Sequence, residues 1–257
     1  MITEFLKPKT PAEAVQLKQA TPGAVYMAGG SWINSSRSAM TPETVVSLAG
    51  LNLNYIKRNG GDTLIGAMAT LQEILDSPLV PAYLKESLIL FRNRNIRNQG
   101  TLAGAVAAKN PAFSVLSVLI AAGAMLETPE EEISVEKYIA SGSSALILSV
   151  RLPDRVGVRS AKYSVTARGV SLVSVAAGIC ERELRLVIAQ DGGKIERLTD
   201  LEKTLNPDVL PDDRDELAER ISKAVMSFDD YRTSAAFKKY IAGVMLADCL
   251  IKAAKGA

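Results

Sequence analysis

The sequence predicts an α+β protein made of two parts. In the first fifty residues a helix precedes two buried strands, which is typical of a small β-α-β unit. Shorter helices and strands then alternate as far as a buried strand at residues 145–153. After Pro153, three strand-like runs at close spacing predict an antiparallel meander, and helices follow. With 257 residues, 47% of them hydrophobic, the chain has enough material for one large domain or two modest ones.

The first helix has a clear beginning. Thr10 is its expected N-cap, Pro11 its first residue and Glu13 its third. The expected strands next to it cover residues 24–28 and 44–48. A hairpin with the turn N-G-G-D follows, then a capping box T-L-Q-E that starts a short helix at Thr70. Another helix is expected from Pro81 to about residue 91.

Residues 92–108 follow, and their apolar residues show neither the helical nor the strand periodicity. Asn110-Pro111 then starts an apolar helix that stops at Gly123. Beyond a boundary near residues 153–158, the expected elements are strands followed by helices. The strands are expected at residues 163–168, 171–179 and 184–189. The helices are expected at about residues 213–226 and from residue 233 onward.

Charge and cysteine usage exclude several classes of protein. Thirty basic and twenty-eight acidic residues give a net charge of +2, which argues against a nucleic-acid binder. No apolar run is long enough to span a membrane, and the N-terminus lacks a signal pattern. The cysteines, Cys180 and Cys249, form no CxxC pair, which favours a reducing compartment. We expect a cytoplasmic protein that binds neither nucleic acid nor membrane.

The chain contains no histidine. This excludes Ser-His-Asp and Cys-His catalysis and removes the commonest nitrogen ligand of zinc. Cysteine clusters of the kind that hold iron–sulfur centres are missing too. We therefore expect no metal ligands, and an enzyme of this composition needs an organic cofactor for its chemistry.

A first glycine loop follows the strand A-V-Y-M-A, in the order Ala28-Gly29-Gly30-Ser31-Trp32. Adjacent glycines let main-chain N–H groups face an anion with no Cβ in the way, and Ser31 adds a hydroxyl. The motif is neither G-x-G-x-x-G nor a Walker loop. Taken alone, an ordinary turn is about twice as probable as a ligand-binding loop.

A second loop of small residues, N-Q-G-T-L-A-G, lies at residues 98–104. It follows a basic stretch that contains Arg92, Arg94 and Arg97. Two interpretations stand equal on the pattern alone. One is a solvated basic loop before a buried helix, and the other is a second loop that approaches phosphate, with arginines that pair with phosphate or with an acidic partner.

Taken in order, these segments resemble the FAD-binding subunit of molybdenum hydroxylases. This is the middle-sized subunit of enzymes of the xanthine dehydrogenase and carbon monoxide dehydrogenase type. The resemblance rests on A-G-G-S-W, I-R-N-Q-G-T-L-A-G, P-A-F-S-V-L-S-V-L-I-A-A-G-A and D-Y-R-T-S-A-A-F-K-K-Y-I-A-G-V-M-L. It covers nearly the whole chain. Each motif alone is moderately specific, and four in sequence are a strong match.

The resemblance implies an α+β fold of two domains. Residues 1–155 would form an FAD-binding domain of the vanillyl-alcohol oxidase and para-cresol methylhydroxylase type. It would have a small α/β lobe, about 1–53, and a larger α+β lobe, about 54–155, with FAD between the lobes. Residues 156–257 would form a small C-terminal domain like that of the carbon monoxide dehydrogenase flavoprotein, with a three-stranded antiparallel sheet and helices.

In the family, the A-G-G loop and the T-x-G-G loop both approach the FAD diphosphate. The resemblance thus implies FAD as the cofactor, with no catalytic side chain and no metal ligand in this chain. Ile147 is expected near the flavin, and Lys162 or Arg168 is expected to reach the cofactor from the C-terminal domain. The cofactor-binding residues carried over are Ala28, Gly29, Gly30, Ser31, Trp32, Gly100, Thr101, Gly104, Ser114 and Ile147.

The chain departs from the family pattern at several of these positions. Ala103 replaces a glycine, Ala105 an asparagine, Ser114 an aspartate and Ser117 a proline. Ser31-Trp32 stands where threonine-aspartate is common. Each change removes a polar contact or adds a methyl group. A methyl group on backbone that approaches a phosphate costs ~1 kcal/mol or more where φ is positive. The departures indicate a divergent branch of the family.

The resemblance implies an electron relay. Substrate is hydroxylated at a molybdenum centre in a large subunit, electrons pass through iron–sulfur clusters in a small subunit, and the flavin delivers them to NAD or another acceptor. The expected partners are therefore a molybdopterin-binding large subunit and an iron–sulfur small subunit, with the stretch R-N-R-N-I-R-N as a contact region. The equal alternative for this stretch is a loop that only supports the flavin site.

Two other functions rank below this one. The first is a non-catalytic assembly subunit that has lost FAD, which Ala103, Ala105 and Ser114 favour. The second is a stand-alone flavin oxidase. Against it, the chain lacks a large substrate domain and any histidine for covalent flavin attachment.

Overall fold

The computed structural model of the chain describes residues 2–154, 156–166, 169–180, 183–206, 210 and 213–255. The chain folds into two compact units, and each takes several stretches of sequence. Unit 1 comprises Met1–Val80, Asn93–Lys109 and Ala124–Leu152. Unit 2 comprises Pro81–Arg92, Asn110–Gly123 and Pro153–Ala257.

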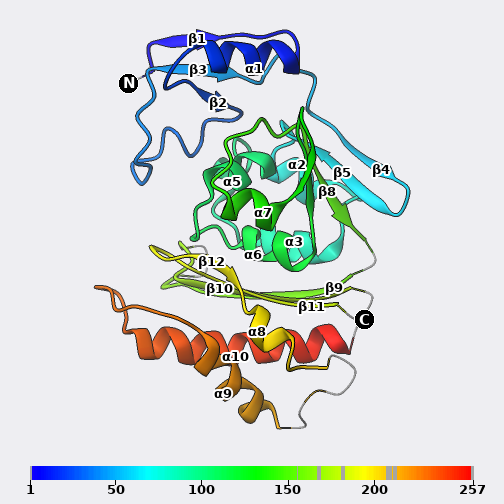
Figure 1. Cartoon of the computed structure of the whole chain (residues 1–257), viewed down its shortest axis with the longest axis vertical. Helices are drawn as coiled ribbons and strands as arrows, with labels where there is room; N and C mark the ends of the chain where they lie inside the picture. The colour runs from blue at the N-terminus through cyan, green and yellow to red at the C-terminus, as the bar shows by residue number, and fades with distance from the viewer. Residues whose placement is uncertain are drawn as a thin grey trace. The chain divides into compact units, whose positions relative to one another are not determined.

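The first sheet of unit 1 has three parallel strands in the order β1-β3-β2 (Figure 1). They are β1 (Glu4–Leu6), β2 (Val25–Met27) and β3 (Thr44–Ser47), and α1 (Pro11–Ala20) packs on β3. The Thr10 hydroxyl accepts a hydrogen bond from the N–H of Glu13 at 3.1 Å, so the predicted start of α1 is confirmed. The β-α-β unit is confirmed as well. The sequence did not reveal β1, because it is three residues long and mostly exposed.

The second sheet of unit 1 has the strand order β4-β5-β8-β6-β7, with antiparallel pairing of β4 with β5, of β6 with β7 and of β6 with β8. Its strands are β4 (Ile56–Asn59), β5 (Asp62–Gly66), β6 (Met125–Glu127), β7 (Glu132–Ser134) and β8 (Ser149–Pro153). The predicted hairpin pairs β4 with β5, with Gly60 at a φ of +62° in the turn. The predicted capping box at Thr70 starts α2 (Leu71–Asp76), because the hydroxyl of Thr70 and the carboxylate of Glu73 each accept an N–H of the other residue.

Residues 92–108 are regular where the sequence predicted a break. They contain α4 (Arg94–Arg97) and α5 (Leu102–Ala108), and α7 (Val135–Ala140) lies further along in unit 1. Asn93 caps α4 and Thr101 caps α5 through side-chain oxygens. Helices of four and seven residues are too short for a periodic pattern to emerge.

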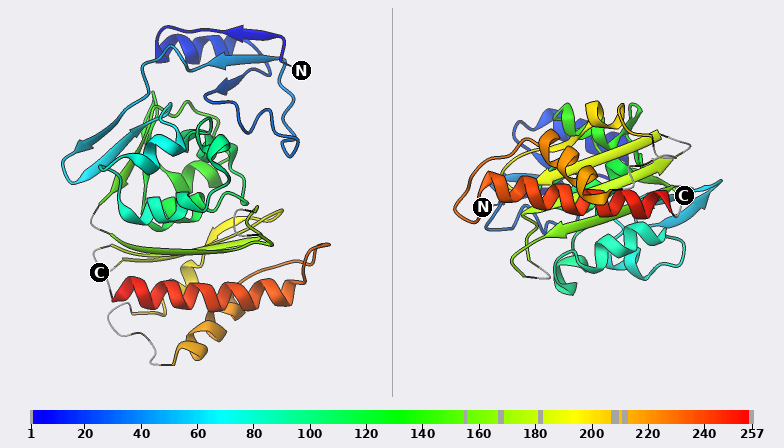
Figure 2. Two further views of the ribbon diagram at one scale, coloured as in Figure 1. Left: turned by 180° about the vertical axis from the view of Figure 1, so that it is seen from behind. Right: turned by 90° about the horizontal axis from the view of Figure 1, so that it is seen from below.

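Unit 2 is a four-stranded antiparallel sheet with helices on both faces. The strands run in the order β12-β11-β10-β9, with β9 (Gly157–Tyr163), β10 (Val173–Cys180), β11 (Glu183–Gln190) and β12 (Ile195–Arg197). Figures 1 and 2 show α10 (Ala235–Ala254) and α9 (Arg214–Ala224) on one face and α3 (Ala82–Ile89) and α6 (Val115–Ala121) on the other. The short α8 (Thr199–Glu202) follows β12.

Close packing joins the sheet of unit 2 to α6. A Cβ added to Gly178 of β10 would lie 2.0 Å from the carbonyl oxygen of Ala121, so only glycine fits there. The hydroxyls of Ser117 and Ser174 are 3.1 Å apart in the same interface. On the other face, α10 packs on β9 and β10 and α9 packs on α10, and the two helices bury a hydrophobic cluster with side chains of β10 and β11.

Two sequence predictions for this sheet need correction. A three-stranded sheet was expected, and the structure adds β12, whose three residues make no alternating pattern. The first strand was expected at residues 163–168, but β9 covers Gly157–Tyr163. Residues 167 and 168, and with them Arg168, lie outside the described residues. Among the described helices, none combines the length and apolar composition needed to cross a bilayer.

Candidate cofactor site

The two glycine loops that the sequence places about seventy residues apart meet in unit 1. A Cβ added to Gly29 would lie 1.6 Å from the main-chain oxygen of Gln99, which leaves no room for any other residue. A Cβ on Gly100 would lie 3.1 Å from the hydroxyl oxygen of Ser31. The glycines therefore allow two main chains to touch, and the loops form one surface.

The first loop turns sharply after β2. Gly30 has a φ of +67°, a left-handed conformation that favours glycine, and its carbonyl accepts the N–H of Asn34 at 3.0 Å. Within the described part of the chain, the N–H groups of Gly29, Gly30 and Ser31 and the hydroxyl of Ser31 donate to no protein acceptor. These residues are not fully buried, so a ligand or water can reach the loop and accept from these donors.

The second loop is fixed from both sides. The N–H of Gly100 donates to Ile96 at 2.7 Å, and its carbonyl accepts from Leu71 at 2.8 Å. Thr101 is buried, and its hydroxyl oxygen accepts from the N–H of Gly104 at 3.0 Å. Thr101 thus caps α5, while its hydroxyl proton remains available to a further acceptor.

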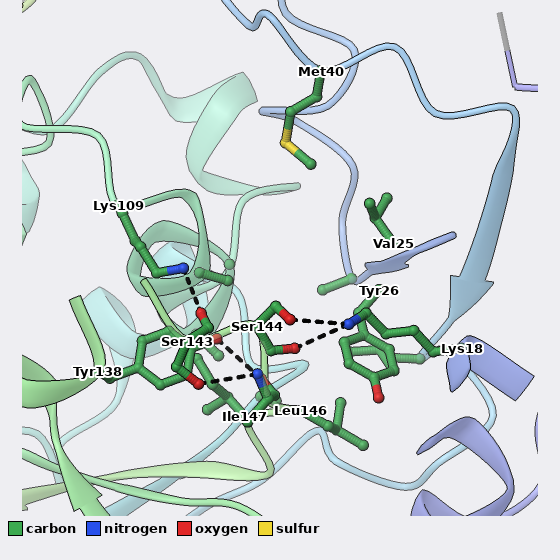
Figure 3. Close-up of a pocket in the computed structure, with 17 residues that line it drawn as sticks. Lys18, Val25, Tyr26, Met40, Lys109, Tyr138, Ser143, Ser144, Leu146 and Ile147 are labelled. Atoms are coloured by element: carbon green, nitrogen blue, oxygen red, sulfur yellow. Dashed lines mark hydrogen bonds between the residues drawn. The ribbon is translucent and has the colours of Figure 1, made fainter. Parts of the chain in front are cut away.

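A cavity of about 240 Å³ lies beside the loops, within unit 1. Its walls are mostly small or apolar, and polar groups gather around the segment 143–145 (Figure 3). A cavity of this size accommodates part of a dinucleotide rather than the whole of one. It is lined by Lys18, Val25, Tyr26, Ala28, Met40, Leu48, Ala67, Ala103, Gly104, Ala107, Lys109, Tyr138, Ser143, Ser144, Ala145, Leu146 and Ile147.

Most of the predicted site residues come together here. Ala28, Gly104 and Ile147 line the cavity, and the residues around them form the two loops, with Trp32 next to Ser31. Ala103, which replaces a family glycine, also lines the cavity. The predicted residues in the adjoining loops are Gly29, Gly30, Ser31, Gly100 and Thr101.

Ser114 and Lys162 belong to unit 2 instead. Ser114 is buried at the start of α6 and makes no capping hydrogen bond. The Lys162 ammonium donates to the carbonyl of Leu90 at 2.8 Å and to that of Gly169 at 3.3 Å. Burial, and then the charge of Arg92, lower the pKa of Lys162.

The sequence analysis missed six polar residues of the cavity: Lys18, Tyr26, Lys109, Tyr138, Ser143 and Ser144. Each ammonium lies over an aromatic ring, Lys18 at 5.0 Å from the centre of Tyr26 and Lys109 at 5.1 Å from that of Tyr138. Lys109 ends α5 with a φ of 48°, a left-handed conformation unusual for lysine. Its place directly before Asn110-Pro111, where a helix has to end, is the signal that was available.

The ionisation of the cavity follows from burial. Burial, and then the charge of Lys18, lower the pKa of Lys109. Burial raises the pKa of Tyr138 to about 12. Burial, and then the charge of Glu130, also raise the pKa of Tyr26. Both phenols therefore stay protonated near neutral pH, and that of Tyr138 donates to the carbonyl of Ala145.

Two glycine loops in contact beside a cavity with small walls are typical of a protein that binds a nucleotide cofactor through its main chain. The chain belongs to the family described as "FAD binding domain in molybdopterin dehydrogenase", whose model matches residues 1–155. FAD is the cofactor of this family and therefore of this chain.

Relatives and a solved structure resemble the chain over nearly its whole length. The chain is 31% identical to the "uncharacterized protein YgfM" of Escherichia coli (strain K12), over 96% of this chain and 95% of that protein. It is 25% identical to the nicotine 6-hydroxylase medium subunit of Paenarthrobacter nicotinovorans, over 97% of this chain and 96% of that subunit. Its fold matches a chain of the Cu,Mo-CO dehydrogenase in its cyanide-inactivated form, with a TM-score of 0.84 and 23% identity over the whole of both chains.

The residues present fit FAD. The N–H donors of the first loop suit an anionic diphosphate, because no Cβ covers Gly29 or Gly30 and no protein acceptor in the described chain uses them. The cavity offers an apolar wall in Leu48, Leu146 and Ile147 for a ring system.

Proposed function

We propose that this chain is the FAD-binding, electron-transfer subunit of a molybdenum hydroxylase of the xanthine dehydrogenase type. In this role it passes electrons from iron–sulfur clusters to NAD or another acceptor. The main support is the contact of the two glycine loops, which leaves the N–H groups of Gly29, Gly30 and Ser31 without protein acceptors in the described chain. Bound FAD supplies the conversion between one-electron and two-electron transfer.

The residues of the chain bind and orient the cofactor in this proposal. The N–H groups of Gly29 to Ser31 and the hydroxyls of Ser31 and Thr101 donate to the diphosphate, and Ile147 contacts a ring. Gly100 keeps the second loop close to the first, as its contact with Ser31 indicates, and Gly104 leaves room for the Thr101 hydroxyl. None of these groups transfers a proton, which agrees with a chain that contains no histidine.

The proposed partners are a molybdopterin-binding large subunit and an iron–sulfur small subunit. Support comes from the word "medium subunit" in the name of the nicotine 6-hydroxylase relative, which implies larger and smaller companions. In this chain, Arg94 is exposed on α4 and is the candidate contact of the basic stretch.

The domain limits expected from the sequence form part of the proposal. An FAD-binding domain at residues 1–155, with lobes of about 1–53 and 54–155, precedes a C-terminal domain at 156–257. The family model supports the first limit, because its match ends at residue 155. These family domains differ from the compact units, since two helices from the first domain pack on the C-terminal sheet.

An assembly subunit without bound FAD is the second candidate. One observation favours it: Ala103 lines the cavity, at a position where the resemblance implies a glycine. The two candidates predict opposite results for the same experiment.

The experiment is an absorption spectrum of the purified protein, followed by chromatography of the flavin released on heating. Protein without flavin is incubated with FAD and measured again. Stoichiometric, non-covalent FAD is the expected result. Protein that stays colourless and takes up no FAD would instead favour the assembly role.

A further inference from the structure

Three consecutive main-chain carbonyls beside the cavity are bound by three side chains (Figure 3). The Lys109 ammonium donates to Ser143, the Lys18 ammonium donates to Ser144 at 3.3 Å, and the Tyr138 hydroxyl donates to Ala145 at 3.0 Å. Lys18 also donates to the hydroxyl oxygen of Ser144 at 3.1 Å. Lys18, Lys109 and Tyr138 are called the clasp below.

The clasp residues come from three separate elements. Lys18 lies in α1, Lys109 follows α5, and Tyr138 lies in α7. They converge on a segment of irregular backbone between α7 and β8, which starts just after Gly142 at a φ of +68°. Because that segment has no strand beside it, its carbonyls depend on side chains or water for hydrogen bonds.

The same segment leads directly to Leu146 and Ile147, two apolar residues of the cavity wall. Beyond them, the N–H of Leu148 donates to Glu127 at 2.8 Å, and its carbonyl accepts from Ala67 at 2.9 Å. The clasp therefore fixes one end of residues 143–148, and sheet hydrogen bonds fix the other. Ile147 lies between the two anchors.

Lys18 and Lys109 are not explained by ordinary ion pairs of surface lysines. Among the described residues, neither Lys18 nor Lys109 forms an ion pair with a carboxylate. Each ammonium is instead stabilised by a carbonyl and an aromatic ring. The charge of Lys18 disfavours that of Lys109, so the pair is retained at an electrostatic cost.

We propose that Lys18, Lys109 and Tyr138 are positioning residues for the cofactor, which hold residues 143–145 at the cavity so that Ile147 contacts bound FAD. The inference rests on the proposed function, because it requires FAD to use this cavity. None of the three residues belongs to the glycine loops or takes part in electron transfer.

The test compares FAD affinity in Lys109→Met and Tyr138→Phe with the wild type. Methionine keeps the length of the lysine stem, and phenylalanine keeps the ring that packs against Lys109, so each variant mainly loses one donor. We expect the dissociation constant for FAD to rise about tenfold in each variant, because an unsupported carbonyl leaves the segment free to move away. Flavin fluorescence during titration with FAD gives the constants.

Matched controls separate positioning from general damage. Lys137→Met changes the exposed neighbour of Tyr138, and Tyr240→Phe removes an exposed hydroxyl in unit 2. Both should bind FAD like the wild type. Lys109→Arg keeps a cationic donor and should recover most of the lost affinity. Melting temperatures of the FAD-free proteins should stay close to one another.

The outcomes are distinct. Wild-type protein that takes up no FAD would overturn the proposed function and this inference with it. A wild type that binds FAD, with Lys109→Met and Tyr138→Phe equally tight, would overturn only the clasp. Equal losses in Lys109→Met and Lys109→Arg would also overturn it, because they would point to packing rather than to the donor.

Discussion

At the scale of single residues, Gly29 has the least freedom of any position in the site. Its missing Cβ is the space that the carbonyl of Gln99 occupies. From the sequence, we expected this glycine to admit the diphosphate. The structure gives it a further task, because it lets the second loop approach the first.

We predict that Gly29→Val abolishes or greatly weakens FAD binding. A branched side chain would force the two loops apart, since a Cβ 1.6 Å from a main-chain oxygen is impossible. Unit 2 should remain folded, because it shares no residue with these loops. The measurement is flavin content by absorption, together with far-ultraviolet circular dichroism.

The matched control is Gly61→Val, because a Cβ at Gly61 meets nothing within 4 Å and its φ is not positive. This variant should bind FAD like the wild type. A Gly29→Val protein with a full complement of flavin would show that the first loop is placed wrongly.

At the scale of elements, the turn before α10 depends on one carboxylate. Asp230 binds the guanidinium of Arg232 and the ammonium of Lys238, both at 2.9 Å, and accepts the N–H groups of Arg232 and Thr233. Lys238 is only 1% exposed and lies 3.9 Å from the centre of the Phe228 ring. The hydrogen bonds from Arg232, and then from Lys238, hold the pKa of Asp230 well below its usual range.

We predict that Asp230→Asn lowers the free energy of unfolding by about 3 kcal/mol at neutral pH, because it leaves the buried Lys238 without its counter-charge. A carboxylate with a depressed pKa contributes stability above its ordinary pKa of about 4 and loses that contribution as the pH falls further. The difference between wild type and variant should therefore narrow from pH ~7 to pH ~3. Urea unfolding at both pH values measures it.

Asp200→Asn is the control, since that carboxylate is 96% exposed and its ion pair with Lys203 lies on the surface. Its effect should stay below about 1 kcal/mol. If Asp230→Asn is equally destabilising at both pH values, Asp230 acts through packing rather than through its charge.

At the scale of the whole molecule, α4 displays a free cation. Arg94 is exposed and has no ion pair in the described part of the chain, whereas Arg97 is buried and bonded to Gln72. Arg92 lies 5.9 Å from the Phe113 ring centre in a left-handed conformation, so its replacement would disturb unit 2. Arg94 alone is the cleaner probe of assembly.

We predict that Arg94→Glu reduces co-purification with the partner subunits and leaves FAD content unchanged. A reversed charge repels the acidic partner surface that the arginine is proposed to meet. Lys9→Glu, also exposed, serves as the control for added negative charge. Complete assembly of the Arg94→Glu protein would remove this stretch from the proposed interface.

Much of the local structure was predictable because its causes are local. Thr10, Thr70 and the N-G-G-D turn act on neighbours within a few residues, and the elements they start were found. Strands of three residues, such as β6, β7 and β12, were missed because they are too short to show an alternating pattern. They gain their stability from the sheet rather than from their own pattern.

The site shows the same division. The glycine loops were visible as motifs, and their contact through Gly29 and Gln99 required the fold. The clasp as a group left no pattern, because Lys18, Lys109 and Tyr138 come from separate parts of the chain. Only their convergence on residues 143–145 gives them a role.

The placement of α3 and α6 has a consequence for the synthesis of the protein. Both helices lie in the first half of the sequence, and both pack on a sheet whose strands begin at Gly157. As the chain leaves the ribosome, the apolar side chains of α6 stay exposed to solvent until β9 to β11 have been synthesised. In a fragment that ends at residue 155, this apolar face of α6 would remain exposed, and we expect such a fragment to aggregate.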